Sequence, residues 1–541
     1  MIKWLLPSAI LLLLGILLYS STAPDDKYIS CWPAWTLAHG KGLVNYSLER
    51  VEMSSTLLWV LQLAAFSKLT GIQPPMLASL FAIVFGIVTI ITSTFIAEGF
   101  RKGAGLYAGL LTATCLPIVN WTMGGMEATL TAGLYLWVVY SWHGIIANGR
   151  QYYTILAPTW LALMVRPEMP ICLFILSLYA VWVACRKGRA RDGLIILALV
   201  LIGSAALVAF RLYYFHALVP QPVMAKSGRP LLSSMHYGML YLFKSLNTGY
   251  LWPLLLTTLF GAYRGRLHVA GRTDMLVMAA LIYAAFAVAS GGDFLEAGRF
   301  LVPAVSLLCI LGAIWILAFE CRKAVLMMLV LVQIAGCMVF AYTGQRGLLI
   351  TDALRLRAMP YTRGFDWFDT GSVGQVRDME VVRQMTDLIP RIASAKQDYP
   401  IIASHQMGIV LYYALTSSKL QVVVNDTFGL QDRILISQPE AKQLMSNTYG
   451  FYNGDAVYWR LVESGHLVAP DITYYSWIIP PYKYVQDNYM PFYVQTGNFS
   501  SLGVRRNRAG IANFSIYVRK PLFQQLQLST IRKDFGEFRT F

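Results

Sequence analysis

Long apolar runs that recur through the amino-terminal part of the chain limit what it can fold into. The chain has 541 residues, of which 56% are hydrophobic and only 13% are charged. An apolar run of about 20 residues is long enough to cross a bilayer as a helix. A soluble domain has no core that could bury so many runs of this length. The chain is therefore predicted to be an α-helical polytopic membrane protein.

The runs predict about 11 membrane-spanning helices. They are predicted at residues 4–19, 76–97, 104–120, 127–146, 152–165, 169–185, 193–213, 246–262, 274–290, 299–319 and 324–342. One further run, 57–69, is short for a span and is typical of a helix that lies along the membrane surface. We therefore expect a transmembrane domain over 1–342, with a first outer loop and juxtamembrane helix at 21–71.

Lysine and arginine gather in loops that this count places on the same side of the membrane as Lys3. Cytoplasmic loops of membrane proteins carry such an excess, so the amino terminus is predicted to lie in the cytoplasm. The same bias accounts for the net charge of +16 without nucleic-acid binding, and it suits anionic membrane lipids. The basic clusters are Arg101-Lys102, Arg150, Arg186–Arg191, Arg264–Arg272 and Arg322-Lys323.

The loops on the opposite side carry acidic, glycine-rich and mixed-charge clusters instead. Each cluster alone is typical of an ordinary helix cap or loop. Their convergence on one face predicts a polar cavity that opens outward at the membrane surface. The clusters are Asp25-Asp26, Glu49–Glu52, Gly124–Glu127, Arg166–Glu168, Tyr213–Lys226 and Gly291–Arg299.

The composition changes after the last apolar run. Residues 343–541 contain an amphipathic segment at 378–389 and short β-like runs at 399–403, 420–424 and 472–479. Alternating helix and strand signals of this kind predict a soluble α/β domain. Because the number of spans is odd, this domain is expected on the outer, extracytoplasmic side of the cytoplasmic membrane.

Several outer segments also occur in a recognisable order. They are Asp25–Ser30, Leu37–Tyr46, Glu49–Glu52, Leu57–Trp59, Trp121–Glu127, Arg166–Glu168, Tyr213–Lys226 and Gly291–Pro303. Together they resemble the GT-C glycosyltransferases, and most of all the AftB-type terminal arabinofuranosyltransferases of mycobacterial cell-wall synthesis. Asn425–Asp432 is similar to a short motif of related outer domains. The segment Val219–Pro222 departs from the pattern, since Pro-Asn-Thr is expected there.

The resemblance implies a GT-C fold and a polyprenyl-phosphate donor that carries one sugar, here arabinofuranose. Transfer would take place on the outer side, to a hydroxyl of a surface glycan. A different sugar, or a protein or glycolipid acceptor, is the alternative. The absence of a Walker A motif and of a strand-borne Gly-x-Gly-x-x-Gly agrees with a donor that is not a nucleotide.

Transfer from a phosphate ester needs a base for the acceptor hydroxyl and cations for the leaving phosphate. We assign Asp25 as the general base. A neighbouring Asp26 would raise the proton affinity of the pair, or would hold an acceptor hydroxyl or a divalent cation. Lys226 and Arg299, and then Arg166, are the candidates for phosphate binding.

The remaining outer carboxylates are candidates for binding the sugar or the acceptor. They are Glu52, Glu127, Glu168 and Asp293. An internal ion pair that closes a helix end is an equally good interpretation of Arg166-Pro167-Glu168. The histidine and carboxylate spacing is not that of a zinc site, so no metal ligand is assigned and no cofactor is predicted beyond a possible divalent cation.

A transporter or flippase of a lipid-linked sugar is the main alternative from another class. Such a protein is expected to place charges within spans and broken helices in repeated halves. Here the acidic residues lie at outer helix ends and no internal repeat is found. The transferase interpretation is therefore favoured.

Overall fold

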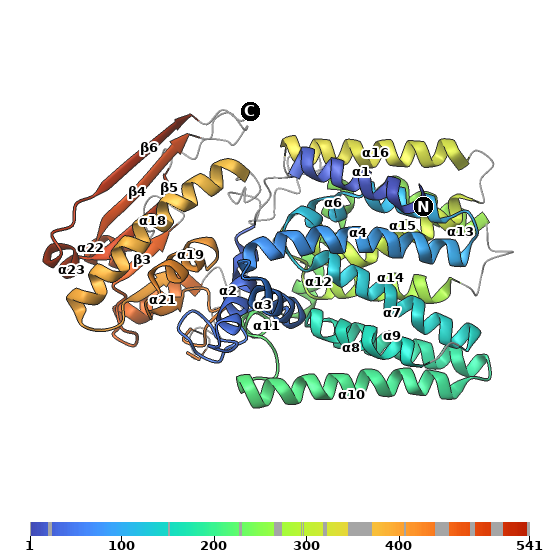
Figure 1. Cartoon of the computed structure of the whole chain (residues 1–541), viewed down its shortest axis with the longest axis horizontal. Coiled ribbons are helices and arrows are strands. Elements are labelled where there is room, and N and C mark those ends of the chain that lie inside the picture. Colours follow the sequence, from blue (N-terminus) through green and yellow to red (C-terminus); the bar gives the residue numbers. More distant parts are fainter. Residues whose placement is uncertain are drawn as a thin grey trace.

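The structure is a helical bundle with a smaller mixed α/β domain at one end (Figure 1). It is a computed structural model. The residues that it describes are 2–19, 24–149, 152–226, 230–264, 273–293, 295, 297–317, 322–343, 371–404, 407–435, 437–438, 454–475, 482–498 and 512–537.

The bundle contains a helix in each of the predicted membrane-spanning ranges, which is what a bilayer requires because a helix satisfies its own backbone polar groups. Its helices are α1 (Ile2–Tyr19), α4 (Pro74–Phe100), α5 (Gly105–Thr114), α6 (Leu116–Met123), α7 (Ala128–Asn148), α8 (Tyr153–Val165), α9 (Met169–Arg186), α10 (Ala190–Phe215), α12 (Leu231–Thr248), α13 (Trp252–Arg264), α14 (Asp274–Ala289), α15 (Val302–Ile316) and α16 (Arg322–Thr343).

Within the described residues, six helices are long and apolar enough to cross a membrane, namely α4, α7, α9, α10, α15 and α16. The pair α5–α6 would make a seventh, although it is bent by 63°. Pro117 lies in the first turn of α6, and because proline has no backbone N–H it cannot continue the preceding helix. α1, α8 and α14 are shorter apolar helices.

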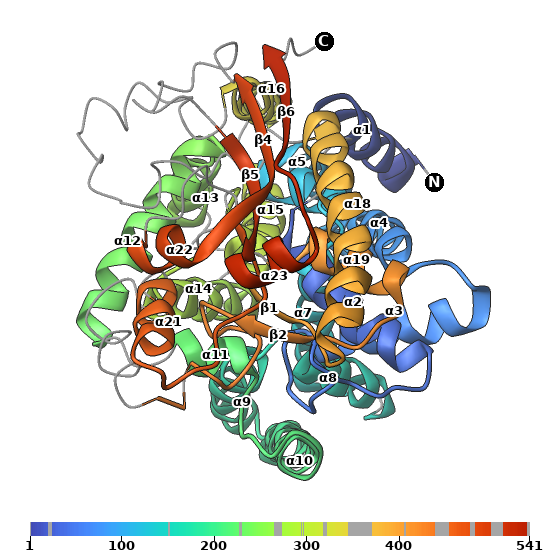
Figure 2. The ribbon, with the colours of Figure 1, turned by 90° about the vertical axis from the view of Figure 1, so that its left-hand side faces the viewer.

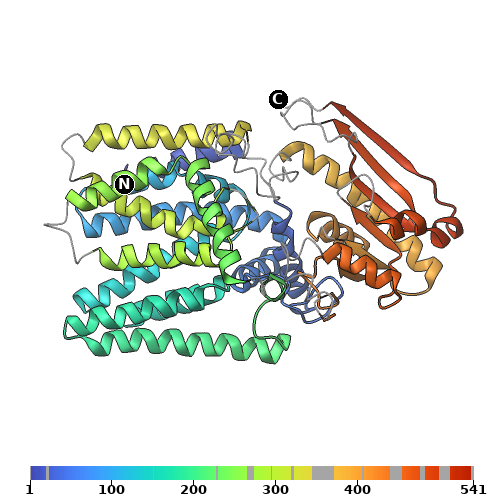
Figure 3. The same ribbon diagram turned by 180° about the vertical axis from the view of Figure 1, so that it is seen from behind.

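Two features of the bundle differ from the sequence prediction. The span expected at 246–262 is divided between the end of α12 and α13, with Gly249 to Leu251 between the two helices. α12 as a whole was not predicted, because only one of its faces is apolar. In Figure 3 it runs across the ends of neighbouring helices instead of parallel to them.

Three helices lie between the bundle and the C-terminal domain (Figure 1). They are α2 (Asp26–Ala38), α3 (Leu57–Thr70) and α11 (Gln221–Lys226). α3 is the predicted surface helix, and it ends at Gly71 in the left-handed conformation. These elements carry the first outer loop and the Tyr213–Lys226 segment to the same end of the bundle.

The C-terminal domain is built on one mixed sheet of the order β2-β1-β3-β5-β4-β6. β1 (Ile401–Ser404) pairs in parallel with β2 (Val423–Asp426) and with β3 (Ile472–Tyr475). Each predicted β-like run therefore overlaps a strand, although β2 begins three residues later than predicted and residues 476–479 lie outside the described residues. β5 (Ala512–Arg519) runs antiparallel to β3 and β4 (Tyr489–Asn498), and β6 (Ile531–Glu537) is parallel to β4. The other described helices of this domain are α18 (Gly371–Lys396), α19 (Ile409–Ser418), α21 (Gly454–Glu463), α22 (Lys483–Asn488) and α23 (Lys520–Gln525). In Figure 2, α18 lies on one side of the strands β4, β5 and β6, and α21 and α22 lie on the other.

The first outer loop binds the edge of this sheet. The hydroxyl of Ser47 accepts a hydrogen bond from the Val424 amide at 2.9 Å and donates one to the Val424 carbonyl at 3.2 Å. The Tyr46 hydroxyl donates to the Met407 carbonyl at 2.7 Å. The C-terminal domain is therefore joined directly to the loop that follows α1.

The start of α1, which carries Lys3, and the end of α4, which is followed by Arg101, lie at the end of the bundle away from the C-terminal domain (Figure 1). Lys3 pairs with Glu98 at 2.7 Å, and Arg101 donates to the carbonyl of Ile314 at 2.9 Å. This grouping agrees with the predicted set of cytoplasmic loops. Arg150 and residues 265–272 lie outside the described residues.

Labelling of introduced cysteines would test the predicted orientation. In a variant without Cys185 and Cys321, Val468→Cys in the C-terminal domain should react with a membrane-impermeant maleimide in intact cells once any outer barrier is opened. Val468 is 69% exposed, so the reagent can reach it. Lys187→Cys, at the exposed end of α9, is the matched control and should react only after the cytoplasmic membrane is broken. The reverse pattern would overturn the orientation.

Candidate functional site

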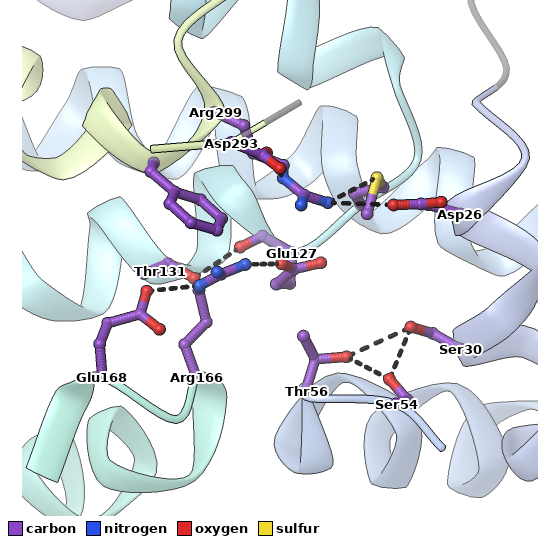
Figure 4. Close-up of polar contacts among 12 residues, drawn as sticks. Asp26, Ser30, Ser54, Thr56, Glu127, Thr131, Arg166, Glu168, Asp293 and Arg299 are labelled. Carbon is purple, nitrogen blue, oxygen red and sulfur yellow. Dashed lines mark hydrogen bonds and ion pairs between the residues drawn. The ribbon is translucent and has the colours of Figure 1, made fainter. Parts of the chain in front are cut away.

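Charged side chains from separate loops meet beside α2, at the end of the bundle that faces the C-terminal domain (Figure 1). Figure 4 shows their contacts. Each loop connects two helices, so the bundle determines where its polar residues lie. Asp26 begins α2, Glu127 precedes α7, Arg166 and Glu168 lie between α8 and α9, and Asp293 and Arg299 lie between α14 and α15. The predicted convergence of the outer motifs therefore holds for these six residues.

Arg299 lies at the centre of the first half of this cluster. Its Nε donates to Asp293 Oδ2 at 2.6 Å, and its Nη1 lies 3.7 Å from Asp26 Oδ2. The guanidinium is also 5.8 Å from the ring centre of Trp121 and 5.3 Å from that of Phe300. Only 8% of the Arg299 side chain is exposed, so its charge depends on these carboxylates and rings.

A glycine turn sets the position of Asp293. Gly292 has φ = +75°, and a Cβ built on it would lie 2.5 Å from Cβ of Tyr241. A larger residue would be strained and would collide with α12. The Tyr241 hydroxyl in turn accepts a hydrogen bond from the Phe300 amide at 3.1 Å, which fixes the short helix η2 (Arg299–Leu301).

Arg166 forms the second half of the cluster and is held by two carboxylates. Its Nε donates to Glu168 Oε1 at 2.5 Å, and its Nη1 donates to Glu127 Oε1. The hydroxyl of Tyr283 also donates to Glu168 Oε1, at 2.9 Å. Arg166 thus forms the internal ion pair that the sequence left as an alternative to phosphate binding, and it positions Glu127 and Glu168.

Glu127 has an oxygen that these contacts do not use. Its Oε1 faces Arg166, whereas Oε2 is buried and, within the described part of the chain, has no hydrogen-bond partner. In Figure 4 this oxygen points away from Arg166. A buried carboxylate oxygen in this state is costly unless a ligand or water donates to it.

The two adjacent aspartates face different neighbours. Asp26 faces Arg299, and burial raises its pKa while Arg299 and Lys226 act in the opposite direction. Asp25 Oδ1 instead accepts a hydrogen bond from the Ile409 amide at 2.8 Å, where α19 begins. Burial raises the pKa of Asp25 to about 7, the Ile409 amide opposes this rise, and the charge of Asp26 adds to it.

Lys226 ends α11 beside the same cluster. Solvent reaches its side chain, yet the surrounding protein atoms lower the pKa of its ammonium group. Asp293 and Asp26 act in the opposite direction, which places Lys226 within electrostatic range of both carboxylates. The cation therefore lies on the side of the cluster that also holds Arg299.

Glu52, predicted to bind sugar or acceptor, is engaged elsewhere. Its two oxygens accept hydrogen bonds from Nε and Nη2 of Arg211, on α10, at 2.7 Å and 3.0 Å. Its backbone carbonyl accepts from the Gln221 amide at 3.0 Å. The structure therefore gives Glu52 a structural role, because a buried bidentate pair joins the first outer loop to α10 and α11.

Some polar groups beside the cluster were not predicted. The hydroxyls of Ser30, Ser54 and Thr56 form a buried triangle with oxygen separations of 2.9 Å, 2.9 Å and 3.2 Å (Figure 4). Lys27 is 7% exposed and donates to the Ser79 hydroxyl at 2.7 Å. Single serines and a lysine next to an acidic pair carry no pattern that marks them in the sequence.

The described residues contain no group of three or more histidine, cysteine or acidic side chains placed to hold a metal ion. The carboxylates of the cluster are instead paired with arginine. The possible divalent cation thus has no set of ligands within the described ranges.

No protein-family model matches the chain, and no curated protein sequence is detectably similar. Solved structures do match. The crystal structure of ArnT from Cupriavidus metallidurans bound to undecaprenyl phosphate superposes with a TM-score of 0.55, at 14% identity, over 95% of this chain and 97% of that one. Its apo state gives a TM-score of 0.49 at 12% identity, over 95% of this chain and 97% of that chain.

A second group of matches is to an archaeal oligosaccharyltransferase. The oligosaccharyltransferase AglB from Archaeoglobus fulgidus, in complex with an inhibitory peptide and a dolichol-phosphate, gives a TM-score of 0.49 at 11% identity, over 87% of this chain and 68% of that one. The match to ArnT covers both the bundle and the C-terminal domain. The chain is thus a multi-pass membrane protein with the fold of the GT-C type, so the predicted fold class is confirmed.

The Glu52–Arg211 pair gives a testable distinction between a structural and a binding role. Glu52→Gln removes the charge that compensates a buried guanidinium, at a cost of about 3–5 kcal/mol of stability. We expect a clear fall in the melting temperature of the purified protein. Lys3→Met, which breaks an exposed pair, is the control and should cost less than about 1 kcal/mol. Unchanged stability in Glu52→Gln would contradict the structural role.

Proposed function

We propose that the protein is a membrane glycosyltransferase that moves a sugar from a polyprenyl phosphate to an acceptor hydroxyl. The observation that carries this proposal is the meeting of Asp26, the neighbour of Asp25, with Arg299 and Lys226 at one end of a membrane bundle. Transfer from a phosphate ester requires this combination of a carboxylate and cations. The likeness to ArnT, whose structure was solved with undecaprenyl phosphate bound, supports the same class of donor.

The leaving phosphate is assigned to Lys226 and Arg299. Both cations lie close to Asp26 and Asp293, so part of their charge is already compensated. Arg299 has Nη1 only 3.7 Å from Asp26 Oδ2, which is longer than a good charge-assisted hydrogen bond. A phosphate oxygen could take the place of Asp26 at this nitrogen. Arg166, which both of its carboxylate partners already hold, is assigned a supporting role.

The general base is assigned to Asp25. A pKa of about 7 makes its carboxylate a stronger base than an ordinary aspartate, and a base with a pKa near the operating pH is the most effective. The Ile409 amide holds one of its oxygens, which fixes the side chain beside the C-terminal domain. The acceptor would therefore approach from the domain side, and the donor phosphate from the cation side.

The reaction balances with these groups alone. Asp25 takes the proton of the acceptor hydroxyl as its oxygen bonds to the anomeric carbon. The bond from that carbon to the phosphate oxygen breaks, and its electron pair leaves with the polyprenyl phosphate. Lys226 and Arg299 stabilise the charge that develops there. Glu127 Oε2, Glu168 and Asp293 are assigned to sugar hydroxyls or to orienting the cations.

The finer assignments follow the sequence resemblance. They are arabinofuranose as the sugar, a surface glycan as the acceptor, and transfer at the outer face of the cytoplasmic membrane. The decisive experiment is mass spectrometry of the lipid-linked sugars and glycans of a deletion strain. Membrane vesicles that take up a lipid-linked sugar without forming a covalent product would favour a flippase instead.

Variants of the two cations would test the phosphate site. Lys226→Ala should lose most transfer activity, because it removes a charge-assisted contact to the leaving phosphate. Arg299→Lys should keep the buried charge beside Asp293 but recover only part of the activity, since a point charge cannot replace a planar fork. The measurement is single-turnover transfer from a synthetic donor, with melting temperatures as the control. Normal turnover in both variants would place the phosphate elsewhere.

The aspartate pair offers a matched test of the base. Asp25→Asn keeps the shape of the side chain and removes its basicity, so transfer should slow by about 10²–10⁴-fold, the usual worth of general-base catalysis. Binding of the donor should survive. Asp26→Asn should weaken substrate binding more than it slows the chemical step. Full activity in Asp25→Asn would remove the base assignment, and chemistry lost only in Asp26→Asn would transfer it to that residue.

The pH dependence of transfer adds an independent check. Asp25 must be ionised to act as a base, so activity should fall as the pH drops through about 7. The charge of Asp26 raises the pKa of Asp25, so Asp26→Asn should move this acidic limb to lower pH. The measurement is the pH profile of single-turnover rates. A limb that moves upward, or does not move, would contradict Asp25 as the titrating group.

A further inference from the structure

Two contacts of the C-terminal domain lie directly beside residues assigned to the reaction. Asp25, the neighbour of Asp26, accepts a hydrogen bond from the Ile409 amide at 2.8 Å. Gln221 begins the helix that ends with Lys226, and its Nε2 donates to the carbonyl of Gly429 at 3.0 Å and to that of Asp432. One contact thus adjoins the carboxylates and the other adjoins the cation.

Both contacts come from loops at the carboxyl ends of neighbouring strands. Residues 407–409 follow β1, and the loop 427–432 follows β2. β1 and β2 are parallel neighbours, with Ser404 paired to Asp426 at their carboxyl ends. Because the carboxyl ends of parallel strands lie side by side, one rigid unit holds both sides of the cluster.

The contact at Asp25 is close enough to require a glycine. A Cβ built on Gly408 would lie 2.1 Å from Cγ of Asp25 and 2.4 Å from its carbonyl oxygen. Both distances are far below any real carbon contact, and the backbone of Asp25 could not move aside without moving Asp26. The amide of Ile409 therefore reaches the carboxylate only because residue 408 has no side chain.

The contact at Gln221 is made to a loop that is fixed from within. The Asp426 carboxylate accepts hydrogen bonds from the amides of Phe428 at 2.9 Å and Leu430 at 2.8 Å. The Asp432 carboxylate accepts from the amides of Asp426 and Ile434. These bonds hold the carbonyls of residues 429 and 432 in place, so Gln221 meets a preformed pair of acceptors.

Helix α11 also packs into the C-terminal domain through an apolar residue. Ala225, which precedes Lys226, is 4% exposed. It belongs to a buried cluster whose other members include Ala403, Leu435, Val457 and Tyr458, all in the C-terminal domain. The helix that carries Lys226 is thus bonded to the domain at its first residue and packed against it at its fifth.

We propose that the C-terminal domain is a positioning part of the phosphate site, with Gln221 as the positioning residue that acts through Lys226. This inference rests on the proposed function, because it takes Lys226 as a phosphate ligand. It assigns a task to Asn425–Asp432 and to Gln221, which lies in the Val219–Pro222 segment that departs from the expected pattern. Loss of the Gln221 bonds would leave Lys226 present but misplaced.

Binding of undecaprenyl phosphate to the purified full-length protein tests this proposal. Gln221→Met keeps the length of the side chain and removes both donated hydrogen bonds, so binding should weaken by about 10-fold, from the usual worth of two hydrogen bonds. The matched control is Lys396→Met, which breaks the 2.9 Å pair with Asp471 inside the C-terminal domain. It should leave binding unchanged even if the melting temperature falls.

A double variant separates positioning from general damage. If Gln221 acts through Lys226, then Gln221→Met combined with Lys226→Ala should bind no more weakly than Lys226→Ala alone. Additive losses, or normal binding in Gln221→Met while Lys226→Ala is impaired, would overturn the inference and leave the proposed function intact. Normal binding in Lys226→Ala would overturn the phosphate assignment on which both depend. Gln221→Asn, with a shorter amide, serves if Gln221→Met does not fold, and should weaken binding to a smaller extent.

Discussion

A buried guanidinium held by carboxylates from different loops is the interaction on which this end of the molecule depends. Arg299 reaches Asp293 at 2.6 Å and faces Asp26, while Arg166 joins Glu127 to Glu168. Burying these charges is costly, and a buried charge that loses its partner is strongly destabilising. The loops that carry the paired side chains therefore hold one another in place. The ring of Phe300 contacts both guanidinium groups, at 5.3 Å and 4.7 Å, and links the two pairs.

The membrane fold could be predicted because apolar length is a local property. Each predicted range contains a helix. The bias of lysine and arginine toward alternate loops also predicted which helix ends lie at the same end of the bundle. The exceptions have local causes. Pro117 lies at the bend between α5 and α6. α12 has only one apolar face, so the sequence contains no continuous apolar run that would predict it. A helix that lies across the end of the bundle does not need an apolar run long enough to cross a bilayer.

The sequence predicted which loops come together, but it did not predict most of the ion pairs that their side chains form. Five of the six predicted clusters contribute residues to the site, but Glu52 of the sixth pairs with Arg211, 159 residues away. The sequence around Arg211 predicts a membrane span and gives no sign of this partner. The partner of each charged side chain depends on how the helices are rotated and on the path of the loops. The spacing of residues in the sequence predicts neither of these. Arg166 was ambiguous for the same reason, because a cation with two nearby carboxylates suits a ligand site or an internal pair equally well.

The hydrogen bonds between Ser47 and Val424 have a consequence for how the C-terminal domain can be handled. β2 is an edge strand, and the edge of a sheet offers unpaired backbone groups to any passing strand. In the intact chain the Ser47 hydroxyl occupies both polar groups of Val424 on that edge. A fragment cut away from the membrane part would expose this strand, so self-association through β2 is the natural hazard of expressing the domain alone.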